Sequence, residues 1–95
     1  MFTFEEICEL ATPIARKHGI KSLSLFGSYA RGDATESSDV DFLFQAGERM
    51  GLWQVSGLLL DLEAAFGSVD LVSTGSRDVD FLAQIAKDCR LIYER

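Results

Sequence analysis

The chain has 95 residues, 47% of them hydrophobic, and a formal net charge of −6. This length suits a single domain, and the apolar share is enough for one hydrophobic core and too high for a disordered chain. The acidic balance and the scattered basic residues exclude a large nucleic-acid footprint, which needs clustered lysines and arginines. No apolar stretch reaches the roughly 18 residues of a membrane span, and the first residues lack the basic segment of a signal peptide. We therefore expect a cytoplasmic protein that binds neither a membrane nor, directly, nucleic acid.

The first predicted element is an amphipathic helix over residues 4–18. Thr3 and Glu6 form a capping-box pattern, and the apolar residues that follow recur at helical spacing. Pro13 lies inside this segment and should kink or split the helix, and Gly19 should end it.

After this helix the pattern alternates between short strands and helices. Segments with the alternating or β-branched composition of strands are 22–26, 40–45 and 69–73. Segments with apolar residues at helical spacing are 52–66 and 81–89, and the end at 91–93 is either a short strand or a docked tail. Residues 29–38 have loop composition, with room for a short helical turn at their start. This order predicts an α/β domain with a small mixed β-sheet flanked by helices.

The most specific pattern in the chain is GSYARGDATESSDVD, from Gly27 to Asp41. Gly27 lets the backbone approach a phosphate closely, and the Ser28 hydroxyl can donate a hydrogen bond to it. Asp39 and Asp41 are two residues apart on a predicted strand and therefore point to the same face. Paired carboxylates can hold Mg²⁺, and two such ions can clamp the attacking and leaving oxygens of a displacement at phosphorus. The pattern predicts a metal-dependent transfer of a nucleotide.

Asp70 is the candidate for a third carboxylate, because it lies inside the apolar run 69–72 of the next strand. An isolated carboxylate is costly to bury unless it is paired or bound to metal. In that role it would complete the metal site and help to deprotonate the attacking hydroxyl. The alternative is a strand-edge residue that faces water, and the sequence leaves both open.

Several other residues have a structural interpretation. The Asp-Val-Asp-Phe-Leu string at 39–43 recurs at 78–82, where helical periodicity follows, so we interpret Asp78 and Asp80 as helix-start residues and not as a second metal site. Cys8 and Cys89 fit small buried hydrophobes better than a disulfide.

Three large apolar residues are candidates for a protein interface, although core packing is favoured for each: Leu52, Trp53 and Phe81. His18, the only histidine, is interpreted as a helix-end or surface residue and not as a base.

The motif spacing resembles that of the nucleotidyltransferases of the DNA polymerase β type. The fuller strings LFGSYARG at 25–32 and SDVDF at 38–42 resemble the minimal nucleotidyltransferases, small prokaryotic proteins that are often antitoxins paired with a HEPN-domain toxin. The resemblance covers nearly the whole chain, including VDLV at 69–72, and no motif position departs from the pattern.

The resemblance implies a single minimal nucleotidyltransferase domain over residues 1–95, with a polymerase-β-like fold. It implies that two Mg²⁺ ions and the phosphates of ATP are bound there. By position, the implied catalytic and metal-binding residues are Asp39, Asp41 and Asp70, and the implied nucleotide-binding residues are Gly27, Ser28 and Arg31. For Arg31, a surface ion pair with Asp33 or Glu36 is an open alternative.

Members of the resembled family transfer AMP from ATP to a tyrosine of the partner toxin and so block its RNase site. The resemblance therefore implies an AMPylating antitoxin in a hetero-oligomeric complex with a HEPN-type toxin encoded nearby. Two alternatives stay open. One is a small-molecule nucleotidyltransferase, although nothing in this short chain resembles an acceptor pocket. The other is an antitoxin that acts by binding and occlusion without catalysis.

Overall fold

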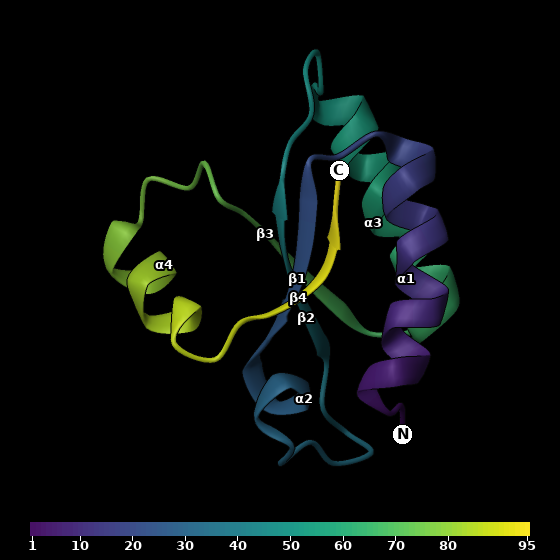
Figure 1. The fold of residues 1–95 in the computed structure, drawn as a ribbon, viewed down its shortest axis with the longest axis vertical. Helices are drawn as coiled ribbons and strands as arrows, with labels where there is room; N and C mark the ends of the chain where they lie inside the picture. Colours follow the sequence, from purple (N-terminus) through teal and green to yellow (C-terminus); the bar gives the residue numbers. More distant parts are fainter.

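The chain folds into one mixed four-stranded sheet with helices on both sides, as the computed structural model of all 95 residues shows (Figure 1). The strands are β1 (Ser22–Phe26), β2 (Val40–Gln45), β3 (Val69–Ser73) and β4 (Arg90–Glu94). The helices are α1 (Phe4–His18), α2 (Gly27–Arg31), α3 (Leu52–Phe66) and α4 (Val79–Ala86). The predicted α/β class is confirmed, and the chain end that could be a strand or a docked tail is a strand.

The strand order is β3-β2-β1-β4. β1 pairs antiparallel with both β2 and β4, whereas β2 and β3 are parallel because the chain crosses over through α3. In this register Phe26 lies opposite Asp41, and Asp41 lies opposite Asp70. The end of β1 and two of the predicted site carboxylates therefore meet at one end of the sheet.

One face of the sheet forms the hydrophobic core with α1 and α3. On β2, the buried residues Val40, Phe42 and Phe44 alternate with Asp41 and Leu43. Since successive side chains on a strand point to opposite faces, Asp41 is directed away from the core. The twelve buried residues of the core come from α1, β1, β2, α3 and the turn before β1: Ile7, Ala11, Ala15, Ile20, Leu23, Leu25, Val40, Phe42, Phe44, Leu58, Leu62 and Phe66.

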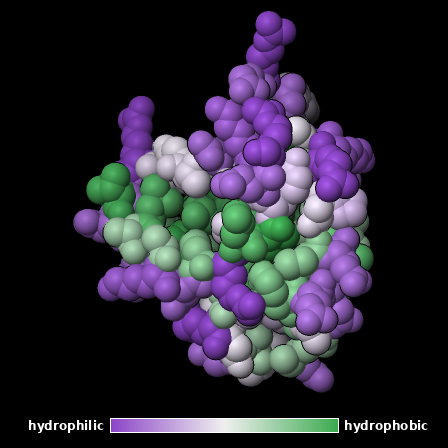
Figure 2. All heavy atoms as spheres, viewed as in Figure 1, coloured by the Kyte–Doolittle hydropathy of each residue, from purple (hydrophilic) through white to green (hydrophobic).

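The other face of the sheet is only partly covered. Figure 1 shows α4 on this side, standing apart from the α1 and α3 layer. Apolar side chains gather over α4 in Figure 2. The exposed apolar residues include Val79 of α4, at 69%, and Leu91 of β4, at 56%. α4 approaches the sheet through Phe81, whose ring meets that of Phe26 edge to face at 6.4 Å.

The predicted split at Pro13 is wrong, because α1 runs as one helix from Phe4 to His18. Pro13 lies on the exposed side of the helix, so the backbone carbonyl that loses its partner can bond to water. The predicted helix start is confirmed, since Thr3 and Glu6 form a capping box. None of the four helices has the length and apolar character that crossing a membrane would require.

The expectation of core packing is wrong for Leu52 and Trp53, which are 81% and 86% exposed. They occupy the first turn of α3, whereas the buried positions of that helix begin only at Leu58. They also lie at the end of the sheet remote from Asp41, because β2 starts near the site and runs away from it before α3 begins. Phe81 is also outside the hydrophobic core, and its side chain is 37% exposed.

Candidate active site

The site is built around a close approach between Gly27 and Asp41. β1 ends at Phe26 and α2 begins directly at Gly27, so the predicted Gly-Ser turn is the first turn of a short helix. Gly27 has a φ of +73°, and a Cβ at this position would collide with Oδ2 of Asp41. Only glycine adopts this conformation without strain and leaves room for the carboxylate.

The three predicted carboxylates come from neighbouring chain segments at the same end of the sheet. Asp41 and Asp70 are register partners on β2 and β3, and Asp70 is exposed on β3, which is an edge strand. Asp39 directly precedes β2, and its Oδ1 accepts a hydrogen bond from the Ser68 hydroxyl at 2.5 Å. In their present positions, no three carboxylate, imidazole or thiol groups form a metal-binding cluster. The role of the three aspartates as metal ligands therefore stays a prediction.

The electrostatics of Asp41 show how closely the carboxylates of the site are gathered. The pKa of this carboxyl is raised from 3.8 to about 6, mostly by burial and further by the negative charges of Asp70 and Asp39, against the opposing charge of Arg31. Near neutral pH the site therefore concentrates negative charge on oxygen atoms that can only accept. Mg²⁺ prefers such ligands, and it would relieve the repulsion between them. The donor set thus fits the predicted metal.

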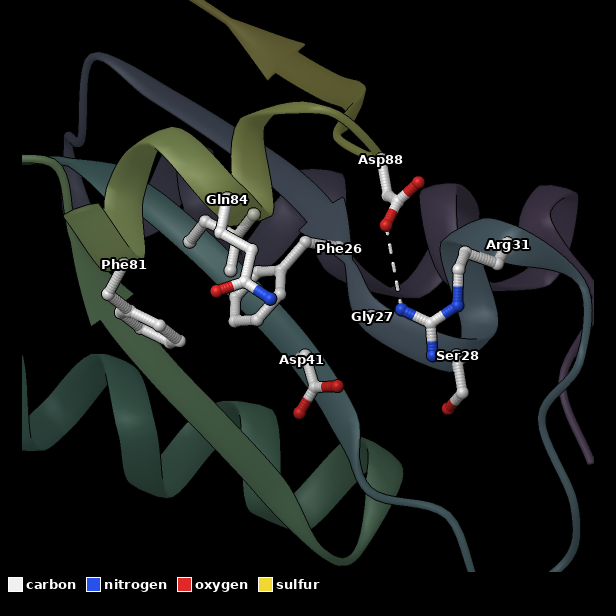
Figure 3. A pocket seen from close by; sticks show the side chains of 9 residues that line it. Phe26, Gly27, Ser28, Arg31, Asp41, Phe81, Gln84 and Asp88 are labelled. Atoms are coloured by element: carbon white, nitrogen blue, oxygen red, sulfur yellow. Dashed lines mark ion pairs between the residues drawn. The ribbon is translucent and has the colours of Figure 1, made fainter.

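A cavity of about 360 Å³ opens beside Asp41 (Figure 3). Ser28 and Arg31 line it from α2. Arg31 forms ion pairs with Asp33, at 3.3 Å, and with Asp88, at 3.6 Å. The sequence left open whether Arg31 binds a nucleotide or forms a surface ion pair with Asp33 or Glu36, and the ion pair with Asp33 is present in the structure. Arg31 nevertheless remains at the cavity, where its cation can bind an anionic ligand.

The other wall of the cavity was not predicted from the sequence. It consists of residues from α4 and the loop that follows: Phe81, Gln84, Ile85 and Asp88. Phe81, Gln84 and Ile85 are spaced three and four residues apart and so lie on one side of α4, and this spacing was the only signal in the sequence. The interpretation of Asp78 as a helix-start residue is confirmed, since its Oδ1 accepts a hydrogen bond from the Phe81 N–H at 3.0 Å.

Comparisons with known proteins agree with the resemblance to nucleotidyltransferases that the sequence motifs indicated. Residues 9–95 match the model of the family described as polymerase beta, nucleotidyltransferase. The protein adenylyltransferase MntA of Thermococcus cleftensis is 40% identical over 81 residues, which cover 80% of this chain and 82% of the relative.

Two solved structures have the same fold. A protein provisionally described as a minimal nucleotidyltransferase superposes with a TM-score of 0.79 at 30% identity, covering 94% of this chain and 95% of that chain. A chain from the complex of a tri-AMPylated Shewanella oneidensis HEPN toxin with an MNT antitoxin gives a TM-score of 0.65 at 22% identity, covering 87% of this chain and 66% of that chain. The second likeness establishes the fold alone. Together they confirm the expected polymerase-β-like architecture.

Proposed function

Because the chain belongs to the polymerase β-type nucleotidyltransferase family, we propose that it is an antitoxin that transfers AMP from ATP to a tyrosine of a HEPN-domain RNase toxin. The transfer neutralises the toxin, with which the chain forms a hetero-oligomeric complex. The observation that carries the proposal is the carboxylate of Asp41 packed against Gly27 at a cavity also lined by Ser28 and Arg31. The name of the relative supports a protein acceptor, and the AMPylated HEPN toxin of the fold neighbour supports the choice of partner.

The phosphates of ATP bind at the α2 side of the cavity. The Ser28 hydroxyl donates a hydrogen bond to a phosphate oxygen, and Arg31 supplies a charge-assisted hydrogen bond. Arg31 reaches the phosphates by leaving Asp33 and Asp88, and exposed ion pairs of this kind are weak.

Asp39, Asp41 and Asp70 would hold two Mg²⁺ ions, which neutralise the charge that develops on the leaving pyrophosphate. The tyrosine hydroxyl oxygen attacks the α-phosphorus, and the bond from that phosphorus to the bridging oxygen of the β-phosphate breaks. Asp70 accepts the hydroxyl proton. Its exposure on the edge strand β3 leaves it open to a side chain of a docking protein.

The test is transfer of label from ATP carrying radioactive phosphorus at the α-position to the toxin encoded nearby, with Mg²⁺ present. We expect label on the toxin with the wild-type chain and none with Asp41→Asn or after chelation of the metal. Asp80→Asn is the matched control, because Asp80 belongs to the second Asp-Val-Asp string and does not line the cavity.

The alternatives give different results. A stable complex that inhibits the toxin without any label, and that survives Asp41→Asn, would indicate occlusion without catalysis. Label on a metabolite or antibiotic, with none on the toxin, would indicate a small-molecule nucleotidyltransferase.

A further inference from the structure

The α4 wall of the cavity has no part in the binding of phosphate or metal described above. Phe81, Gln84 and Ile85 form it, and they share one side of the helix. Figure 3 shows the Phe81 ring and the Gln84 amide across the cavity from Ser28 and Arg31. An aromatic ring, an aliphatic chain and a neutral amide are poor partners for phosphate oxygens, so this wall suits a different part of a ligand.

The Phe81 ring is held in place but remains accessible. Its backbone N–H is bound by the Asp78 side chain at 3.0 Å, and its ring packs edge to face against Phe26, with an interplanar angle of 85°. The residue is still 37% exposed. A fixed, accessible aromatic ring at a cavity is a surface on which a nucleobase can stack.

The Gln84 side chain is exposed and points into the cavity beside Phe81 (Figure 3). Its amide offers a hydrogen-bond acceptor next to a donor. Adenine presents the complementary pair along its edge, with the 6-amino group as donor and the adjacent ring nitrogen as acceptor. A glutamine at the rim of a stacking site can therefore recognise the 6-amino group.

An ion pair connects the α2 side of the cavity with the α4 side at one end. Asp88, which follows α4, forms an ion pair with Arg31 of α2 at 3.6 Å. The cavity volume of about 360 Å³ is within the range of ligand cavities and suits one mononucleotide. A nucleotide with its phosphates near Ser28 would then extend its base toward α4.

We propose that α4 forms the nucleobase subsite of this protein, in which Phe81 stacks on adenine and Gln84 hydrogen-bonds its 6-amino edge. This inference rests on the nucleotide-transfer function proposed above. It makes α4 the element that selects the base, whereas α2 and the aspartates act on the phosphates.

The test measures dissociation constants of the full chain by calorimetry for three ligands, each with Mg²⁺. The ligands are ATP, inorganic tripolyphosphate, which has no base, and purine riboside triphosphate, which lacks the 6-amino group. Phe81→Leu retains an apolar contact with Phe26 and removes the flat ring. We expect it to weaken ATP binding about tenfold and to leave tripolyphosphate binding unchanged.

For Gln84→Ala we expect ATP binding to weaken roughly fivefold to tenfold, with binding of purine riboside triphosphate unchanged. The matched controls are Val79→Ala, an exposed apolar residue of the same helix, and Gln45→Ala, an exposed amide outside the cavity. Both should bind all three ligands as the wild type does.

The subsite is refuted if Phe81→Leu or Gln84→Ala weakens the binding of tripolyphosphate as much as that of ATP, since the effect is then structural. It is also refuted if either variant leaves ATP binding unchanged. Its failure differs from failure of the proposed function. Normal AMP transfer by the wild type, together with unchanged ATP affinity in Phe81→Leu and Gln84→Ala, would overturn the subsite alone. Base-selective ATP binding without any transfer to the toxin would support the subsite and overturn the proposed function.

Discussion

Replacement of Asp41 by asparagine should separate the stability of this protein from its activity. The carboxyl of Asp41 is half-buried beside two other aspartates, and its pKa is raised from 3.8 to about 6. At pH 7 it is ionised in surroundings that disfavour its charge. Asparagine has nearly the same shape without the charge, so Asp41→Asn should stabilise the fold and abolish nucleotide transfer.

The size of the gain follows from the pKa shift. A rise from 3.8 to about 6 corresponds to about 3 kcal/mol at 1.36 kcal/mol per pH unit. Because the side chain is partly exposed, solvent screening reduces this value, and we expect about 1–2 kcal/mol at pH 7. For a domain of this size that is a rise in Tm of roughly 4–16 °C.

The gain should depend on pH. The folded state binds the Asp41 proton more tightly than the unfolded chain does, so the free energy of unfolding of the wild type falls as the pH rises from about 4 to about 6. Below this range both states are protonated, and above it the full cost is present. The advantage of Asp41→Asn should therefore grow between pH 4 and pH 6 and then level off.

The assay is urea unfolding followed by circular dichroism from pH 4 to pH 8, with a chelator present. Asp80→Asn, at an exposed position of α4, is the control and should have little effect. Addition of Mg²⁺ should then stabilise the wild type more than Asp41→Asn, because a ligand that binds only the folded state stabilises it. An Asp41→Asn protein that is less stable than the wild type, or whose advantage is the same at every pH, would refute the electrostatic reasoning.

Three further substitutions test the geometry around Gly27 and Arg31. Gly27→Ala and Gly19→Ala both place a Cβ at positive φ, +73° and +67°, and should each cost at least about 1 kcal/mol of stability in urea unfolding. Only Gly27→Ala should also abolish AMP transfer. The Cβ of Ala at position 27 would collide with Asp41, whereas a Cβ at position 19 meets no atom within 4 Å. Equal loss of transfer in both variants would contradict this explanation. Asp88→Asn removes one ion-pair partner of Arg31, so ATP binding measured by calorimetry should tighten severalfold, while stability changes by less than about 1 kcal/mol. Weaker ATP binding would show that Asp88 instead holds Arg31 in its binding position.

Much of the fold could be predicted from the sequence, because its signals are local. The helix caps at Thr3 and Asp78 are hydrogen bonds between residues three positions apart, and the chain carries both partners in one short string. The burial of Phe42 follows from alternation along a single strand. The predicted burial of Trp53 is wrong. The spacing of apolar residues on a helix shows which of them share a face, but not how much of that face the rest of the molecule covers.

The sequence by itself determined which groups gather on one side of the candidate site, because Gly27, Ser28 and the aspartates at 39 and 41 lie in one segment that runs from the end of β1 through α2 and a loop into β2. Only the tertiary structure decided what faces that segment. The register of β2 on β3 brings Asp70 beside Asp41, and the position of α4 across the cavity makes Phe81 and its neighbours part of the site. These placements depend on strand pairing and packing between residues far apart in the chain, and a local pattern carries no information about which distant face it will meet.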